Sequence, residues 1–198
     1  MEKENGFKDM SVAGFIESLA SGEPTPGGGS ASAIAGSMGA GLVSMVANLT
    51  LGRKKYADVA DTVEKMRSEA EALRRHLLAL ADADSDAYGK VMSAFKMSKD
   101  TPEQKELRSK AIQEGLKGAA EVPFKVAEAA VAVRRLAEEI SAIGNPNAHS
   151  DAEVAQALAV AAFKGAAANV AINLDSIKDE GFVNVMKDRL EALRSGLE

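Results

Sequence analysis

The stretch TPGGGSASAIAGSMGAGLVSMVANLTLGRKKY, residues 25–56, decides the fold because it joins a glycine run to a long uncharged segment. No charged residue occurs from Pro24 through Gly52, and the basic residues Arg53, Lys54 and Lys55 follow directly. Such a segment is compatible with a phosphate-binding loop, a membrane span or a buried helix. The neighbouring residues discriminate between these three.

The phosphate-loop alternative fails on the residues that flank the glycines. A Walker loop ends in Gly-Lys-Ser/Thr, a dinucleotide fingerprint spaces its glycines, and both follow a strand. Here Gly27, Gly28 and Gly29 are contiguous, and no strand pattern precedes them. A glycine run before a helix still lets backbone N–H groups approach an anion, while the simpler alternative is a flexible hinge.

The membrane alternative is weakened because serine, asparagine, threonine and glycine interrupt the apolar run. On a helix from residue 30 to about 51, one stripe is apolar and another is small and polar. The apolar stripe contains Ala31, Ala35, Met38, Leu42, Met45 and Leu49, and the polar stripe contains Ser30, Ser37, Gly41, Ser44 and Asn48. A helix without a charged face is buried on most sides, so we predict a central or interface helix.

The composition favours one all-α domain over residues 1–198, because apolar residues make up 46% of the chain and aromatic residues 4%. A core of small aliphatic side chains suits closely packed helices. The chain has no cysteine and two histidines, so we predict no metal site. The net charge of −5 argues against nucleic-acid binding. The charged start MEKENGFKDM does not resemble a signal peptide, so we predict a cytoplasmic protein.

Helical periodicity and end signals predict the remaining elements. Helices are expected over residues 11–20, 59–80, 101 onward, 122–143, 150 to about 174, and 183–193. Thr101-Pro102-Glu103-Gln104 and Ser150-Asp151-Ala152-Glu153 are both predicted to be capping boxes at helix starts. A turn is expected at 144–147. No strand pattern competes, so we predict a single-domain bundle of long helices.

The apolar seam of the helix that begins near residue 59 leads to a carboxylate. If this helix continues past Leu80, Asp84 takes a core position, where it must be paired, hydrogen-bonded or protonated. Such a group is a candidate acid or base, and Asp82 lies on an adjacent face. The alternative is a kink at residues 81–85 that turns both carboxylates to solvent.

Two amide side chains in the predicted Ala-rich helix are also expected to be buried. Gly165, Asn169 and Asn173 are spaced four apart and therefore share a face. A buried amide without partners costs about 1–3 kcal/mol. The two asparagines therefore either form a network between helices or face a polar ligand.

Charged residues near the predicted helix ends have two explanations. Asp151 in a first turn complements the helix dipole, and Lys54 and Lys55 after a C-terminus do the same. The two lysines equally suit a ligand that carries carboxylates.

Several motifs together carry a family resemblance. They are Pro26-Gly-Gly-Gly-Ser30, Met45-Val-Ala-Asn-Leu-Thr50, Gly52-Arg-Lys-Lys-Tyr56, Asp82-x-Asp84-x-x-Ala87-Tyr88, Val122-Pro123, Gly144-Asn145-x-Asn147-x-x-Ser150-Asp151 and Gly165-x-x-x-Asn169-Val170-x-Ile172-Asn173-Leu174. The chain resembles the family formed by the C-terminal half of formiminotransferase-cyclodeaminase and by free-standing methenyltetrahydrofolate cyclohydrolases. The resemblance covers nearly the whole chain and implies an all-helical fold, a homodimer and a folate-binding cleft.

The two reactions of this family act on the one-carbon bridge between N5 and N10 of tetrahydrofolate. The cyclohydrolase opens 5,10-methenyltetrahydrofolate to 10-formyltetrahydrofolate, and the cyclodeaminase closes 5-formiminotetrahydrofolate and releases ammonia. The resemblance therefore implies tetrahydrofolate derivatives as partners and no cofactor beyond the folate substrate. From the net charge and the polar residues in the apolar run, we predict no nucleic-acid or membrane partner. Each reaction needs an acid, a base and polar or negative groups beside a cationic amidinium.

The resemblance also implies roles for the unusual residues. Asp84 or Asp82 would favour the cationic methenyl group and accept a proton from water, with Asp151 as a second carboxylate. The predicted substrate-binding residues are Asn145, Asn169 and Asn173 for the pterin, and Gly27, Gly28, Gly29, Ser30, Lys54 and Lys55 for the folate carboxylates.

The length of the chain favours one of the two reactions. It leaves no room for a formiminotransferase domain, so we predict the cyclohydrolase, with the cyclodeaminase as the alternative. An alternative of another class is a non-catalytic dimeric helical binding module whose polar seam sets the register between helices.

Overall fold

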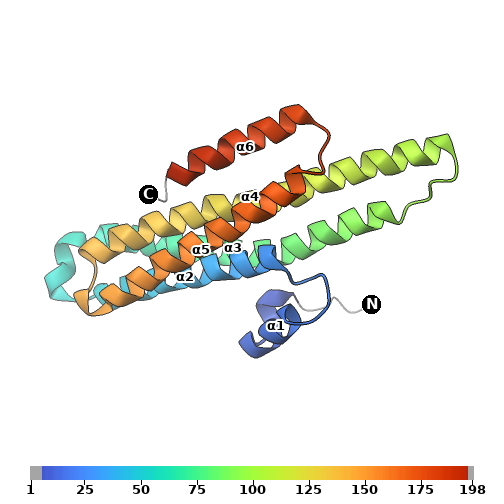
Figure 1. The fold of residues 1–198 in the computed structure, drawn as a ribbon. Helices are drawn as coiled ribbons and strands as arrows, with labels where there is room; N and C mark the ends of the chain where they lie inside the picture. The colour runs from blue at the N-terminus through green and yellow to red at the C-terminus, as the bar shows by residue number, and fades with distance from the viewer. Residues whose placement is uncertain (1–5, 196–198) are drawn as a thin grey trace.

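The computed structural model describes residues 6–195, and every regular element in that range is helical (Figure 1). In chain order the elements are η1 (Phe7–Asp9), α1 (Val12–Leu19), α2 (Gly28–Thr50), η2 (Lys54–Val59), α3 (Ala60–Phe95), α4 (Pro102–Ile143), η3 (Pro146–Ala148), α5 (His149–Leu174) and α6 (Glu180–Arg194). Helices α2 to α5 form an antiparallel bundle, and α6 lies along α4 (Figure 1). The predicted all-α bundle is confirmed.

Helix α2 lies at the centre of the bundle, because it contacts α3, α4 and α5. Glycine permits the close approach of its neighbours: a Cβ atom at Gly39 would lie 3.1 Å from the carbonyl oxygen of Ala155 and 3.2 Å from Cγ1 of Val133. The segments Gly28–Thr50 and Pro146–Leu174 are apolar and long enough to cross a membrane by composition alone. In the folded chain, 61% of the apolar window of α2 is buried, as expected for the predicted central helix.

The small polar stripe of α2 faces α3. The Ser37 hydroxyl donates to the carbonyl oxygen of Arg74 at 3.0 Å, and the Ser30 hydroxyl donates to that of Ala81 at 2.9 Å. Two turns of α2 separate these serines, so the same geometry repeats along the contact. These two serines therefore join α2 to α3 through side-chain bonds to backbone carbonyls.

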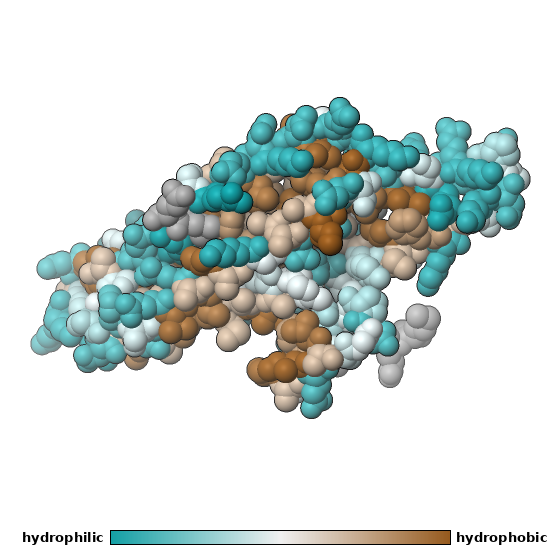
Figure 2. Space-filling model, viewed as in Figure 1, coloured by the Kyte–Doolittle hydropathy of each residue, from teal (hydrophilic) through white to brown (hydrophobic). Residues whose placement is uncertain are grey.

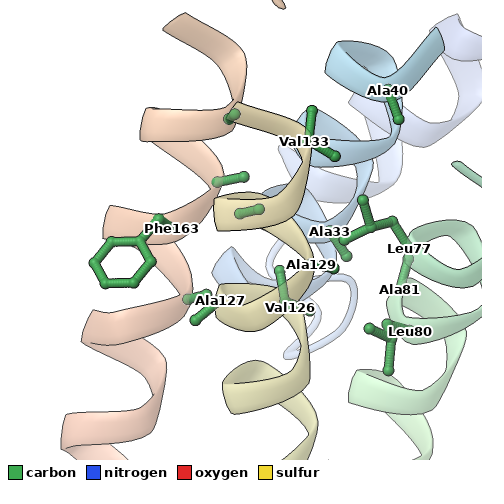
Figure 3. Close-up of a cluster of buried hydrophobic side chains, with 14 residues drawn as sticks. Ala33, Ala40, Leu77, Leu80, Ala81, Val126, Ala127, Ala129, Val133 and Phe163 are labelled. Carbon is green, nitrogen blue, oxygen red and sulfur yellow. The ribbon is translucent and has the colours of Figure 1, made fainter. Parts of the chain in front are cut away.

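The core consists of small aliphatic side chains, as the composition predicted (Figure 3). Its central cluster combines alanines from α2, α4 and α5 with Leu77, Val126, Val133 and Phe163. Alanine at so many contacts allows neighbouring helix backbones to approach closely while excluding water.

Helix α3 continues without a break through residues 81–85, so the alternative of a kink there is wrong. Asp84 consequently stays on the side of α3 that faces the bundle. It is partly buried, between the fully buried Ala81 and the buried Ala87.

Helix α4 differs from the prediction, because the separate helices expected near residues 101 and 122 form one 42-residue helix. Pro123 lies inside it and has no N–H to donate to the carbonyl of Ala119. The Asn173 amide of α5 donates to that carbonyl instead, at 3.0 Å. A side chain from a neighbouring helix therefore replaces the hydrogen bond that proline removes.

The observed helix starts confirm one of the two predicted capping boxes and contradict the other. Thr101 and Gln104 form the predicted capping box, and Ser11 and Asp179 cap α1 and α6. The capping box predicted at Ser150 is wrong. The 3₁₀ turn η3 leads directly into α5, which begins at His149, so Ser150 is already inside the helix.

Two glycines of α2 test the close packing of the central helix. At Gly41 a Cβ atom would meet only the flexible end of Arg74, at 3.7 Å. We expect Gly41→Ala to stabilise the protein by about 0.5–1 kcal/mol through helix propensity. We expect Gly39→Ala to destabilise it by about 1–3 kcal/mol, because Ala155 presents rigid backbone. Urea unfolding measures both changes, and equal effects at the two positions would contradict this packing.

Candidate functional site

A cleft of about 420 Å³ opens at the N-terminal end of α2, where α2 to α5 and the preceding loop meet. Its polar surface comes from the glycine loop, a carboxylate and two amides, and its remaining surface is mainly apolar. The lining residues are Pro24, Thr25, Gly27, Gly28, Gly29, Asp84, Tyr88, Val91, Met92, Phe95, Ala119, Asn169, Ile172 and Asn173. The cleft therefore brings six of the predicted site residues together.

The carboxylate of Asp84 lies against the first turn of α2. A Cβ atom at Gly29 would overlap this carboxylate, so the helix and the side chain approach this closely only because residue 29 is glycine. The Ser30 hydroxyl lies 3.2 Å from Oδ2 of Asp84, and the Ser30 backbone N–H also bonds to the carboxylate. Asp84 thus occupies the position that an anion takes at a helix N-terminus.

Burial raises the pKa of Asp84 above its ordinary value, and the bonds from the Ser30 hydroxyl and N–H lower it by less. The net direction is upward because removal from water penalises the charged carboxylate more than these two donors stabilise it. A carboxyl group with a raised pKa exchanges protons more readily near neutral pH.

The Ser30 hydroxyl is suited to either protonation state of Asp84. This hydroxyl is fully buried and has one proton, with acceptors at Ala81 and Asp84 at 2.9 and 3.2 Å. When Asp84 is charged, the hydroxyl donates to it. When Asp84 is protonated, the hydroxyl donates to the Ala81 carbonyl and accepts from the acid. Neither state leaves a buried donor without an acceptor.

The two amides of α5 face the cleft from the side opposite α3. The amide nitrogen of Asn169 donates to the Gly165 carbonyl at 2.8 Å, and that of Asn173 donates to the Asn169 carbonyl at 2.9 Å. A bond from Asn173 to Ala119 of α4 completes the set. Of the predicted network between helices, only the bond of Asn173 to Ala119 is present, because the other two bonds lie within α5. Both side chains also line the cleft.

The apolar wall of the cleft was missed in the analysis of the sequence. Tyr88, Met92 and Phe95 of α3 follow Asp84 at steps of four and three, so all four residues share one stripe. Ile172 adds an exposed apolar side chain from α5. Extending the helical spacing from Asp84 past Tyr88 would have predicted this wall. Its flat aromatic surfaces suit a planar ring.

Asp82 has a different environment from Asp84. Its carboxylate accepts a hydrogen bond of 2.6 Å from the backbone N–H of Phe7. The Phe7 ring packs edge-on against Phe15 of α1, with ring centroids 5.8 Å apart. Asp82 therefore anchors the N-terminal segment to α3, and it is not among the residues that line the cleft.

Four predicted site residues lie at the other end of the bundle. Lys54 and Lys55 are exposed in η2, and Asp151 lies in the first turn of α5. Asn145 lies between α4 and η3. The 23 residues of α2 separate this end from the cleft by about 35 Å. Within one chain, these residues do not join Asp84 in a single site.

Asn145 is buried and closes the C-terminal end of α2. Its backbone N–H donates to the Thr50 hydroxyl at 2.9 Å, and its side-chain nitrogen donates to the Leu49 carbonyl at 3.2 Å. Its side-chain oxygen accepts from Tyr56 and Asn147. These bonds satisfy helix-terminal groups, so the structure gives this amide a structural role, and its role in substrate binding stays a prediction.

A more open groove of about 840 Å³ lies between another face of α3 and the first half of α4. Asp86, Lys90 and Glu114 line it, with no predicted site residue among the lining groups. Within residues 6–195, no group of three or more histidines or carboxylates is placed to hold a metal ion.

Comparison with known proteins identifies close relatives of this chain. Residues 11–192 match the formiminotransferase-cyclodeaminase family. The chain is 43% identical to a methenyltetrahydrofolate cyclohydrolase of Methylorubrum extorquens, over 90% of this chain and 86% of that protein. It is 35% identical to the mouse formimidoyltransferase-cyclodeaminase over 96% of this chain, which spans only 35% of that longer protein.

A solved structure has the same fold. The crystal structure of formiminotetrahydrofolate cyclodeaminase from Thermotoga maritima superposes with a TM-score of 0.87 and 34% identity. The match covers 96% of this chain and 91% of that one. Similarity therefore extends over the whole bundle.

The raised pKa of Asp84 predicts a stability effect that depends on pH. Because the charged form is disfavoured in the folded state, Asp84 destabilises the fold above its folded-state pKa. Asp84→Asn removes this charge and keeps an oxygen for Ser30. We expect a melting temperature higher by about 2–4 °C near pH 8, which is about 1 kcal/mol at this length, and a smaller gain as acid protonates the wild type.

Asp86→Asn is the matched control, because Asp86 is exposed on the same helix. Its melting temperature should stay within about 1–2 °C of wild type at both pH values. If Asp84→Asn melts at or below the wild type at alkaline pH, Asp84 is not a destabilising buried charge.

Proposed function

The chain belongs to the formiminotransferase-cyclodeaminase family, and we propose that it is a methenyltetrahydrofolate cyclohydrolase. It hydrolyses 5,10-methenyltetrahydrofolate to 10-formyltetrahydrofolate. The observation that carries this proposal is the partly buried carboxylate of Asp84, which lines a cleft large enough for a pteridine. Support for this reaction over its alternative comes from sequence identity, which is 43% to the relative named as a cyclohydrolase and 34–35% to two relatives named as cyclodeaminases.

The proposed chemistry uses Asp84 as both base and acid. The carboxylate favours the cationic amidinium and takes a proton from water as the new C–O bond forms at the methenyl carbon. Asp84 then returns that proton to N5 as the C–N5 bond breaks. The hydroxyl proton leaves to solvent, and a formyl group remains on N10. Ser30 holds the carboxyl in both states.

The rest of the cleft suits the folate. Asn169 and Asn173 would bind the pterin edge, and Tyr88 and Phe95 offer aromatic surfaces to the planar rings. This chemistry requires proton transfer only, so we propose no metal or other cofactor, and no nucleic-acid or membrane partner. A cytoplasmic location is part of the proposal.

The cyclodeaminase is the second candidate function. The structural relative from Thermotoga maritima carries that name at 34% identity. The same carboxyl could donate the proton that ammonia needs to leave, because the two reactions share the cationic methenyl compound.

We also propose that the protein is a homodimer formed through α2. This helix has no charged residue, yet Met38 is 58% exposed, and Met45 and Leu49 on the same stripe are also exposed. Val154 and Ile172 are exposed apolar residues of the neighbouring α5, and Figure 2 shows apolar residues over these helices. Such patches are typical of protein interfaces.

An antiparallel dimer would bring together the predicted site residues that lie at opposite ends of one bundle. A twofold axis perpendicular to α2 makes the two copies of this helix run in opposite directions. Lys54 and Lys55 of one copy would then approach the cleft of the other and could bind the folate carboxylates. The two lysines that follow α2 would therefore bind ligand in the cleft of the partner, because they are too far from the cleft of their own chain.

Turnover measured by the methenyl absorbance band tests the chemistry. The wild type should remove the band when given methenyltetrahydrofolate. Asp84→Asn should lower kcat by about 100- to 10,000-fold, because an amide cannot accept the proton, while Asp86→Asn should keep wild-type turnover. A band that instead appears from formiminotetrahydrofolate would indicate the cyclodeaminase. Undiminished turnover by Asp84→Asn would remove Asp84 from the chemistry.

Mixing two inactive variants tests the antiparallel dimer. One variant carries Asp84→Asn, and the other carries Lys54→Ala with Lys55→Ala. If each cleft uses lysines from the other copy, a mixed dimer has one intact cleft, and random mixing should restore roughly a quarter of wild-type activity. Light scattering should give the mass of a dimer. A monomeric mass, or a mixture as inactive as its parts, would rule out the shared site.

A further inference from the structure

The orientation of both amides in the cleft is fixed by backbone carbonyls. A carbonyl oxygen only accepts hydrogen bonds, so the atom that approaches it must be the amide nitrogen. Asn173 approaches two carbonyls, at 3.0 and 2.9 Å, and Asn169 approaches one, at 2.8 Å. Both side-chain nitrogens are therefore held against backbone, which leaves the two side-chain oxygens for the cleft.

A proline in another helix secures the orientation of Asn173. In a regular helix the carbonyl of Ala119 would accept from the N–H of residue 123. That residue is Pro123, which is buried and has no N–H. The Ala119 carbonyl therefore needs a donor from outside α4, and Asn173 supplies it. Rotating this amide by half a turn would place an oxygen against two carbonyls.

Neither side-chain oxygen has a partner within the protein. In the part of the chain that the structure describes, no hydrogen bond ends on Oδ1 of Asn169 or of Asn173. Both residues line the cleft beside Gly28, where a Cβ atom would lie 3.3 Å from Nδ2 and 4.0 Å from Oδ1 of Asn169. One helical turn separates the asparagines, so their side chains are about 5–6 Å apart at Cβ. Two neighbouring donors on one ring are within reach of both oxygens.

We propose that the side-chain oxygens of Asn169 and Asn173 form an acceptor pair that selects a ligand edge with two adjacent N–H donors. For a pterin, this edge consists of the 2-amino group and N3–H. The inference rests on the proposed function, because that function puts a folate in this cleft. It deepens the proposal by stating which edge of the pterin these residues bind and why they are amides held by backbone.

The acceptor pair also determines what the cleft rejects. A ring with a methyl group in place of the 2-amino group would leave an amide oxygen without a donor. Losing one such bond lowers affinity by about 10- to 100-fold. Apolar residues at these positions would bind both rings with the same affinity. The ratio of the two affinities therefore reports on the amide oxygens.

The test compares the affinities of two ligands for the wild type and for its variants, measured by calorimetry. The ligands are 5-formyltetrahydrofolate and its 2-desamino-2-methyl analogue. Wild type should bind the analogue about 10- to 100-fold more weakly. The alanine variant that removes the acceptor of the 2-amino group, Asn169→Ala or Asn173→Ala, should reduce that ratio to about threefold or less. Asn169→Gln and Asn173→Gln keep both an amide N–H and an acceptor oxygen, so they should keep a larger ratio than the alanine variants, even if those fold poorly.

Asn184→Ala is the matched control, because Asn184 is exposed on α6, outside the cleft. It should keep the wild-type ratio. If the ratio is the same in wild type, Asn169→Ala and Asn173→Ala, another group such as Asp84 binds that edge, and the inference fails while the proposed function stands. If wild type binds neither folate, the proposed function fails together with the inference.

Discussion

The contact between a carboxylate and the first turn of a buried helix is the constraint on which the rest of this structure depends. Asp84 reaches α2 because Gly29 has no side chain, and Ser30 provides both a hydroxyl and an N–H. Burial disfavours the charge, and the helix N-terminus with its donors offsets part of that effect. The result is a carboxyl group that is held rigidly and whose proton affinity is raised.

The packing of the bundle keeps this contact in place. Glycine and alanine along α2 let three helices approach it closely, and Ser30 and Ser37 join it to α3 through backbone carbonyls. Pro123 in α4 contributes in a less direct way, since the carbonyl that it frees orients Asn173. The glycines of α2 and Pro123 of α4 lower the helix propensity of their own helices, and contacts between helices explain why they occur there.

The sequence allowed more of the fold to be predicted than of the site. Periodicity predicted that α2 is a central or interface helix, and that Asp84 lies on the inner side of α3 if this helix continues past Leu80. Grouping Asp84 with Lys54 and Asp151 failed for a single chain, because motif order does not reveal which end of a bundle a residue occupies. The length of α4 was also missed, since a proline usually ends a helix unless a neighbour replaces its lost bond.

A crystal structure with bound 5-formyltetrahydrofolate tests the central claim most directly. The account predicts the pteridine in the cleft beside Tyr88, with the one-carbon group at N5 within hydrogen-bonding distance of the Asp84 carboxyl. The side-chain oxygens of Asn169 and Asn173 should face the 2-amino edge. A folate bound instead in the groove beside Lys90 and Glu114, or one that leaves Asp84 without contact, would contradict it.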